Sequence, residues 1–231
     1  MRGQQRKTNN EKRIALRALN NKSTKQMTNI RLATADDAPA IAGIYGPYCE
    51  STVISFEERA PSAEEMARRV AAIGATRPWV VLEDSALRNG GIVGYAYASP
   101  HHERAAYRWS VSTAIYVSRD HQRRGAGRAL YTTLFALLRG LGYRQATAGI
   151  TLPNPASVGL HTAFGFAPVG VYRRIGYKMG GWHDVGWYQA EVQPAASGIP
   201  ADPRSIRDVV DTPEWHDAVA RGLHHYAAIG D

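Results

Sequence analysis

The sequence predicts a mixed α/β (α+β) fold in which a mostly antiparallel central sheet is flanked by helices. Three observations predict it. Short runs rich in β-branched residues recur along the chain, two helix-capping signatures precede apolar segments, and strands alternate with helices in the second half. Strands that first follow one another and then alternate with helices are typical of a mixed sheet with helices on its faces.

The first half of the chain carries signals for a strand, two helices and a hairpin. A Ser or Thr followed three residues later by an acidic residue marks a helix start, because the two side chains cap backbone amides. Asn-Gly between apolar runs is typical of a hairpin turn. In chain order the predicted elements are the strand NIRLAT (29–34), a helix from Thr34-x-x-Asp37 to about Tyr48, the helix AEEMARRVAAI (63–73) after Ser62-x-x-Glu65, and a hairpin from WVVLED (79–84) through RNGG (88–91) to IVGYAYASP (92–100).

The second half carries signals for strands separated by two helices. Leucines recur at helical spacing after a Gly-rich turn, which predicts a long helix with one buried face. Asn followed by Pro is the usual order of a helix N-cap and the first helical residue. The predicted elements are the strand WSVSTAIYV (109–117), the helix with Leu130, Leu134, Leu137, Leu138 and Leu141, the strand YRQATAGIT (143–151), a helix from Pro155 after Asn154, and the strands APVGVYRRIGY (167–177) and WHDVGWYQAEV (182–192).

Charge divides the 231 residues into a core and two extensions. Residues 1–27 hold eight Lys or Arg and one acidic residue, residues 194–231 hold three and six, and residues 28–193 hold seventeen and thirteen. Most of the net charge of +8 therefore lies in the N-terminal extension, which argues against a nucleic-acid-binding face on the fold. We expect a basic, disordered extension over 1–27, one domain over 28–193, and a C-terminal extension over 194–231 with a short helix from Pro213.

The basic segment has two other interpretations. It is also compatible with an Arg-rich targeting peptide, and Met27, which directly precedes the first strand, is an alternative translation start. The single cysteine, Cys49, excludes an internal disulfide, so a cytoplasmic location and a packing role for Cys49 are expected. No apolar run approaches the ~20 residues of a membrane span, and no membrane partner is expected.

The segment HQRRGAG (121–127) carries the strongest chemical signal. It lacks the third glycine of a dinucleotide fingerprint and the Lys-Ser/Thr end of a P-loop. What remains is Q-x-x-G-x-G between a strand and a long helix, where glycines let backbone amides approach a phosphate and the helix N-terminus adds partial positive charge. Arg123, Arg124 and Arg128 add full charges. The turn therefore predicts a phosphate site, against the alternative of a tight turn with solvated arginines.

Four segments together resemble a known enzyme family. TAIYV (113–117) followed by HQRRGAGRAL (121–130) resembles the acetyl-CoA site of the GNAT N-acetyltransferases. The segments STVISFEE (51–58), LPNPASVGLHTAFGF (152–166) and GWHDVGWYQ (181–189) make the chain similar to the phosphinothricin and methionine sulfoximine N-acetyltransferases. The resemblance implies a GNAT-like fold and acetyl transfer from acetyl-CoA to the free amine of a small amino-acid analogue, by direct attack in a ternary complex.

On the cofactor side, the resemblance implies that the strand end pairs with the pantetheine amides and that the Gly turn holds the pyrophosphate. It also implies that His161 takes the place of a tyrosine that protonates the leaving thiolate in many GNAT enzymes; an ordinary histidine pKa near 6.5 suits proton donation near neutral pH. A buried structural histidine is the alternative. Asn154, Ser157 and His161 fall on one helix face. The implied cofactor-binding residues are Ile115, Tyr116, Val117, Arg123, Arg124, Gly125, Ala126, Gly127, Arg128 and Asn154.

On the acceptor side, the proton-accepting group is the open question. Relatives that this chain resembles have a glutamate, the usual candidate base, at the position of Ser112, and a serine hydroxyl needs activation to take a proton at neutral pH. Glu57 or Glu103 acting through water is the expected base; a substrate amine of low pKa or slow acetylation are the alternatives. Arg104 is a natural forked partner for an anionic substrate. The implied substrate contacts are Phe56, His102, Glu103, Arg104, Thr113 and Ala114.

Two other functions stay open. A GNAT enzyme with another acceptor, such as a protein N-terminus or a polyamine, would keep the cofactor site, and a non-catalytic acyl-CoA-binding module would tolerate the serine. The retained His161 and the SFEE segment favour an enzyme. The histidine pairs at 101–102 and 224–225 lack a ligand constellation, so no metal is expected. Cys49 has no evident base for covalent catalysis, and the sequence leaves a homodimer open.

Overall fold

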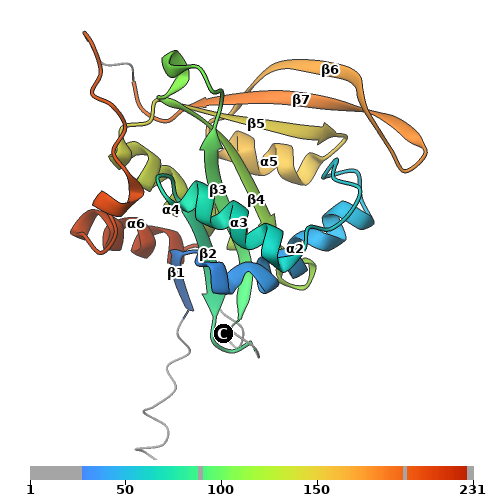
Figure 1. The fold of residues 1–231 in the computed structure, drawn as a ribbon, viewed down its shortest axis with the longest axis horizontal. Helices are drawn as coiled ribbons and strands as arrows, with labels where there is room; N and C mark the ends of the chain where they lie inside the picture. The colour runs from blue at the N-terminus through green and yellow to red at the C-terminus, as the bar shows by residue number, and fades with distance from the viewer. Residues whose placement is uncertain (1–27, 88–90, 195–196, 228–231) are drawn as a thin grey trace, which may run out of the picture.

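A seven-stranded sheet with helices on both faces forms the centre of the molecule (Figure 1). The computed structural model describes residues 28–87, 91–194 and 197–227. The strand order is β1-β2-β3-β4-β5-β7-β6, and only β4 and β5 pair in parallel among the described strands, which confirms the predicted fold class. The elements are β1 (Thr28–Leu32), α2 (Ala38–Glu50), α3 (Ala63–Gly74), β2 (Trp79–Asp84), β3 (Ile92–Pro100), β4 (Ser110–Val117), α4 (Ala126–Leu141), β5 (Gln145–Leu152), α5 (Pro155–Ala163), β6 (Ala167–Lys178), β7 (Gly181–Glu191) and α6 (Pro213–Leu223).

The helix starts follow the capping signals. Thr34 and Asp37 form a reciprocal capping box, although a 3-10 turn over Ala35–Asp37 comes before α2 itself. Ser62 accepts the backbone amide of Glu65 at 3.2 Å and starts α3. β2 and β3 pair antiparallel, as the hairpin prediction requires. Residues 88–90, which hold the Asn-Gly signal, lie outside the described residues.

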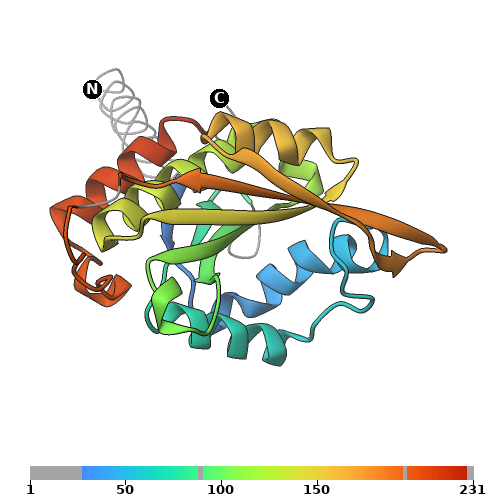
Figure 2. The same cartoon turned by 90° about the horizontal axis from the view of Figure 1, so that it is seen from above.

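Two apolar clusters sit on opposite faces of the sheet. Figure 2 shows α4, α5 and α6 on one face and α2 and α3 on the other. The larger cluster contains the leucine face of α4, whose five predicted leucines are fully buried. The smaller cluster joins α2 and α3 to β2 and β3 and includes buried Cys49. Successive side chains of a strand point to opposite faces of the sheet, so each strand contributes side chains to one core or the other in alternation.

The C-terminal extension joins the larger core. The helix α6, predicted from Pro213, packs against α4 and β1, and Ile206, Val209 and Trp215 belong to the main apolar cluster. The proposed division of the chain at residues 193/194 therefore separates two segments that share one core. No helix in the described part of the chain is long and apolar enough to cross a membrane.

The two parallel strands separate in the middle of the sheet. β4 and β5 pair only where Ser110–Ser112 meets Gln145–Thr147. Beyond Ser112, β4 keeps its antiparallel pairing with β3, while β5 pairs with β7 up to Leu152. The edge of β4 over 113–117 is therefore open toward β5, and this opening positions the site.

Candidate active site

A small cavity of about 70 Å³ lies where β4 and β5 separate. It brings main-chain and side-chain groups of β4 together with one face of α5. Asn154, Ser157 and His161, predicted to share a helix face, all line it. Asn154 also caps α5, because its side-chain oxygen accepts the amide of Ser157 at 3.1 Å. The remaining lining residues are Ile54, Thr113, Ala114, Ile115, Tyr116, Ala148, Gly149, Ile150 and Thr151.

His161 is 4% exposed and both of its ring nitrogens have partners. Nδ1 lies 2.8 Å from the carbonyl oxygen of Ser157, which can only accept, so Nδ1 carries the proton. Nε2 then accepts the hydroxyl of Tyr131 at 2.9 Å. Burial lowers the pKa of His161 below 6.5, with the Ser157 carbonyl partly opposing. His161 is thus a neutral imidazole at pH 7. Its hydrogen-bond partner Tyr131 is a residue that the sequence pattern did not mark as functional.

Tyr131 lies in the buried leucine face of α4, where its helical spacing gives no sign of a polar role. Its ring is fully buried, and burial raises the pKa of its hydroxyl. The hydroxyl also lies 3.4 Å from Oγ1 of Thr113. Thr113, predicted as a substrate contact, therefore points toward α4.

The Gly turn has the backbone geometry of an anion site. Arg123 and Gly125 have positive φ angles of 61° and 86°, and α4 starts at Ala126. The first helical bond runs from the amide of Ala129 to the carbonyl of Gly125, so the amides of residues 126–128 precede every intrahelical acceptor. These amides, with the exposed side chains of Arg123 and Arg128, suit a phosphate-bearing group.

Gln122 of the turn is hydrogen-bonded to α2. Nε2 of Gln122 donates to the hydroxyl of Tyr48 at 3.0 Å, and that hydroxyl donates to the carbonyl of Val117 at 2.6 Å. The carbonyl of Val117, predicted to pair with pantetheine, thus already has a partner within the protein. Gln122 orients the turn relative to the end of β4.

Contacts within the protein account for both glycines of the turn. A Cβ on Gly125 would overlap the carbonyl oxygen of His225, and one on Gly127 would lie 3.2 Å from Cδ2 of Leu160. The positive φ of Gly125 adds strain for any other residue. The C-terminal segment therefore fills the space beside Gly125, where the sequence predicted a phosphate. The glycine is required by that packing and by its backbone angle.

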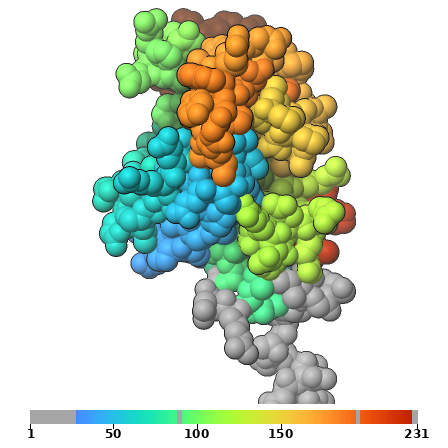
Figure 3. Space-filling model, turned by 90° about the vertical axis from the view of Figure 1, so that its right-hand side faces the viewer, coloured from blue at the N-terminus to red at the C-terminus, as the bar shows by residue number. Residues whose placement is uncertain are grey.

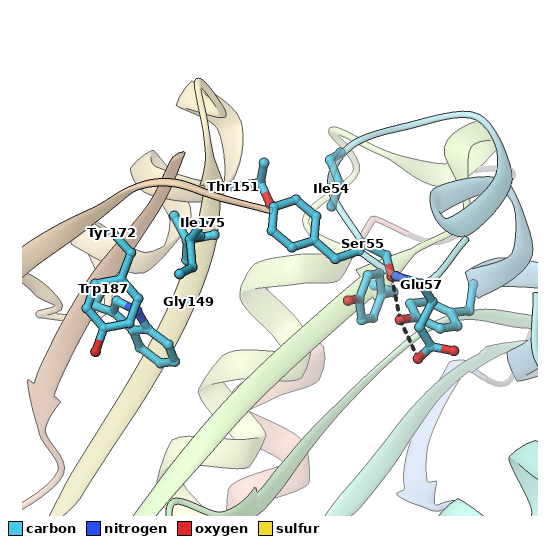
Figure 4. Close-up of a pocket in the computed structure, with 12 residues that line it drawn as sticks. Ile54, Ser55, Glu57, Gly149, Thr151, Tyr172, Ile175 and Trp187 are labelled. Carbon is cyan, nitrogen blue, oxygen red and sulfur yellow. Dashed lines mark hydrogen bonds between the residues drawn. The ribbon is translucent and has the colours of Figure 1, made fainter. Parts of the chain in front are cut away.

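A larger cavity of about 640 Å³ adjoins the smaller one (Figure 4). The loop after α2 forms one wall, and Tyr172, Ile175 and Trp187 of the β6–β7 hairpin form the other, as the close-up shows. Ile54, Tyr116, Gly149 and Thr151 line both cavities, so the two cavities adjoin along the gap. The other lining residues are Tyr45, Ser55, Phe56, Glu57 and Val185.

Glu57 lines this cavity but its carboxylate is already engaged. Arg69 donates to its two oxygens at 2.7 and 3.2 Å, and the hydroxyl of Tyr45 donates at 3.0 Å. Buried Lys178 holds the same loop by donating to the carbonyls of Ser55 and Glu57 at 2.6 and 2.7 Å. These contacts indicate that Glu57 anchors the wall of the cavity.

The predicted contacts His102, Glu103 and Arg104 lie elsewhere. All three are exposed in the loop after β3, and none lines either cavity. The structure instead places their neighbour His101 beside Ser112, with Nδ1 3.3 Å from Oγ. The signal that could have found His101 is the serine itself, which marks a position in need of a new partner. Within the described residues, no cluster of His, Cys, Asp or Glu could hold a metal ion.

Three comparisons with known proteins agree with this geometry. Residues 30–187 match the family described as an acetyltransferase (GNAT) domain. The chain is 39% identical over 180 residues to the phosphinothricin N-acetyltransferase of Streptomyces viridochromogenes, covering 78% of this chain and 93% of that protein. It is 30% identical over 173 residues to the L-methionine sulfoximine/L-methionine sulfone acetyltransferase of Pseudomonas paraeruginosa, covering 73% and 97%. A crystal structure of a phosphinothricin acetyltransferase from Sinorhizobium meliloti in complex with AcCoA superposes with a TM-score of 0.70 at 36% identity, covering 75% and 93%.

Proposed function

The chain belongs to the GNAT acetyltransferase family, and from that premise we propose that it transfers an acetyl group from acetyl-CoA to the free amine of a small amino-acid analogue of the phosphinothricin or methionine sulfoximine type. The family resemblance predicted from sequence is thereby confirmed. One observation carries the proposal. The gap between β4 and β5 has the Gly turn with the first amides of α4 at one end and two adjoining cavities along it, so two substrates can meet there.

The residues around the Gly turn fit acetyl-CoA. The amides of residues 126–128 with Arg123 and Arg128 would hold its pyrophosphate, and the open edge of β4 at Ile115 would pair with pantetheine. Bound acetyl-CoA supplies an acetyl thioester, which a neutral amine can attack. A backbone amide of β4 that faces the gap would stabilise negative charge developing on the carbonyl oxygen. Tyr131 and His161 form the buried proton-sharing pair nearest the gap.

Direct transfer in a ternary complex is supported by the state of the cysteine, the residue type that most readily forms an acyl-enzyme. Cys49 is the one cysteine of the sequence, it is fully buried in α2, and burial raises the pKa of its thiol. A thiol of raised pKa is a poor nucleophile at neutral pH. The acceptor amine therefore attacks the thioester without an acyl-enzyme step. A cytoplasmic location stays a prediction.

A coupled assay of CoA release with calorimetry tests this proposal. We expect submillimolar binding of acetyl-CoA by the full chain and turnover of phosphinothricin or methionine sulfoximine. Turnover of amine-bearing peptides or polyamines in their place would identify another GNAT acceptor. Binding of acetyl-CoA without turnover of any amine would establish the non-catalytic module, and absence of binding would refute the proposal.

We also propose a homodimer formed through the β6–β7 hairpin. β6 is the last strand of the sheet and nearly all of its residues are exposed. Figure 3 shows this hairpin at the surface above the loop after α2. The large exposed apolar side chains there are Val169, Val171, Tyr172, Ile175, Tyr177, Met179 and Trp182. Such a patch is typical of an interface between copies. Light scattering should give a dimer mass, and a monomer at micromolar concentration would contradict it.

A further inference from the structure

Three polar side chains meet at the last paired residues of β4 and β5. Nδ1 of His101 lies 3.0 Å from Oγ1 of Thr147 and 3.3 Å from Oγ of Ser112, and the two hydroxyl oxygens are 3.1 Å apart. Ser112 and Thr147 are register partners, and His101 follows directly after β3. His101, Ser112 and Thr147 therefore form a triangle of mutual contacts where the pairing of β4 and β5 ends.

This triangle lies on the face of the sheet that lines the larger cavity. Side chains two residues apart share a face, so Ser112 faces the same way as Ala114 and Tyr116, both of which line a cavity. On β5 the same alternation puts Thr147 on the face of Gly149, which lines the larger cavity. A spacing of two residues is about 6.6 Å along a strand. The triangle therefore lies one pleat from the cavity that would receive the amine.

The triangle can hold or release a proton with every group satisfied. When the imidazole is neutral with its proton on Nε2, the hydroxyl of Ser112 donates to Nδ1. When the imidazole is charged, Nδ1 donates to Oγ1 of Thr147. In both states the hydroxyl of Thr147 can donate to the carbonyl of Val111, 3.3 Å away. His101 is half-exposed, so its ring can return the proton to water.

The carboxylates near the site are less suited to this task. Both oxygens of Glu57 accept from Arg69, and one also accepts from Tyr45. Glu103 is exposed in the loop after β3 and lines neither cavity. The position that would bring a carboxylate to the gap is occupied by Ser112, whose partner is His101.

We propose that His101 is the proton acceptor of the reaction and acts through the hydroxyl of Ser112, in place of a carboxylate at that position. This inference rests on the proposed acetyl transfer. The substrate ammonium gives a proton to Oγ of Ser112 as that hydroxyl gives its own proton to Nδ1, and the imidazole becomes an imidazolium. The neutral amine then attacks the thioester carbon. The nitrogen loses a second proton as the amide forms, which balances the proton taken up by the departing thiolate.

The side chains packed against His101 are those of Tyr107, Ser112 and Thr147. The ring of Tyr107 meets that of His101 edge-on at 5.8 Å, and His102 packs against Tyr107 at 5.0 Å. From β4 and β5, the facing groups are the hydroxyls of Ser112 and Thr147, which are uncharged. Within the described residues, His101 forms no ion pair.

The test compares kcat/KM from pH 6 to 10 for the parent, His101→Gln, Ser112→Glu and the double variant, with methionine sulfoximine and phosphinothricin as acceptors. Glutamine keeps polar contacts but cannot titrate. We expect His101→Gln to lose about 10²-fold at pH 7. The loss should shrink about tenfold per pH unit above pH 7 and vanish near pH 9, where the free amine needs no base. Ser112→Glu should rescue the loss, so the double variant should lie within about threefold of Ser112→Glu alone.

Three controls separate a chemical role from a structural one. His216→Gln, at an exposed position of α6, should match the parent throughout. Calorimetry should show unchanged affinity of His101→Gln for acetyl-CoA, and NMR should show the ring of His101 titrating in the parent. A pH-independent loss in His101→Gln, or no rescue by Ser112→Glu, overturns this inference alone. A parent that acetylates no amine overturns the proposed function and this inference with it.

Discussion

Lys178 holds the walls of the larger cavity together by hydrogen bonds. Its side chain is 6% exposed and carries three N–H donors, and three backbone carbonyls accept them. The acceptors belong to Cys49, Ser55 and Glu57, so one side chain from the end of β6 fixes the loop after α2. The loop and the hairpin are the two walls of the cavity (Figure 4). The hydrogen bonds of Lys178 join them.

Replacement of Lys178 by Met should loosen that wall. Three buried carbonyls would lose a charged donor, which should cost about 2–4 kcal/mol in the free energy of unfolding. KM for the amine should rise several-fold, while KM for acetyl-CoA, for which we propose the Gly turn as the binding site, should change less. Denaturant unfolding and steady-state kinetics measure both. Arg173→Met, on the exposed part of the same strand, should change stability by less than about 0.5 kcal/mol. Equal rises in both KM values would contradict the anchoring role.

The burial of His161 should make stability depend on pH. Its pKa in the folded protein lies below 6.5, so between these two values the unfolded chain binds more protons than the folded one. The stability contributed by the neutral ring is therefore complete above pH 6.5 and is lost as the pH falls below it. The stability difference between the parent and His161→Asn should shrink from pH 7.5 to 5.5, by at most about 1.4 kcal/mol per pH unit. A difference that stays constant in urea titrations would show that the ring does not remain neutral.

At the scale of elements, the C-terminal segment supports the Gly turn. The amide of Ala227 donates to the carbonyl of Arg124 at 3.1 Å, and the carbonyl of His225 fills the space beside Gly125. The segment is carried there by α6, which packs along α4 and β1. The last described residues of the chain therefore support the Gly turn, whose following amides we propose to bind phosphate.

Ala227→Pro should weaken acetyl-CoA binding by about fivefold. Proline removes the N–H that donates to the turn, and a neutral hydrogen bond contributes about 1 kcal/mol. The melting temperature should hardly change, because Ala227 is exposed and lies beyond α6. Ala227→Ser keeps the N–H and is the matched control. If calorimetry gives the parent's affinity for Ala227→Pro, the segment does not position the turn.

At the scale of the molecule, the described residues from β1 onward build the seven-stranded sheet and both apolar clusters. β1 starts at Thr28, pairs with β2 through Leu32 and contacts α6. The larger apolar cluster contains buried residues of β1, of α4 and of the C-terminal extension. Both cavities are built within these residues.

A chain that begins at Met27 should therefore keep the stability and the turnover of the full chain. We expect melting temperatures within about 1 °C and equal kcat, because the basic sequence of residues 1–27 has no apolar face large enough to join the core. Differential scanning calorimetry and the CoA-release assay measure these values. A large drop in either would show that residues before Met27 contribute to the fold or to the site.

Interactions between near neighbours were readable from the chain alone. The capping residues Thr34, Ser62 and Asn154 mark helix starts because each bonds an amide two or three residues away. The same holds for the leucine face of α4 and for the Gly turn, whose φ angles and helix amides are local. From these features the fold class, the order of the elements and the family could be predicted.

The contacts around the two cavities depended on the tertiary structure, because the residues that form them are far apart in the chain. His101 meets Thr147 across 46 positions, His161 meets Tyr131 across 30, and Lys178 reaches Ser55 across 123. No local periodicity encodes such contacts; they arise where β4 and β5 separate and where the hairpin folds over the loop after α2. Only packing decided that Glu57 is bound to Arg69 and that the loop at 102–104 lies outside both cavities.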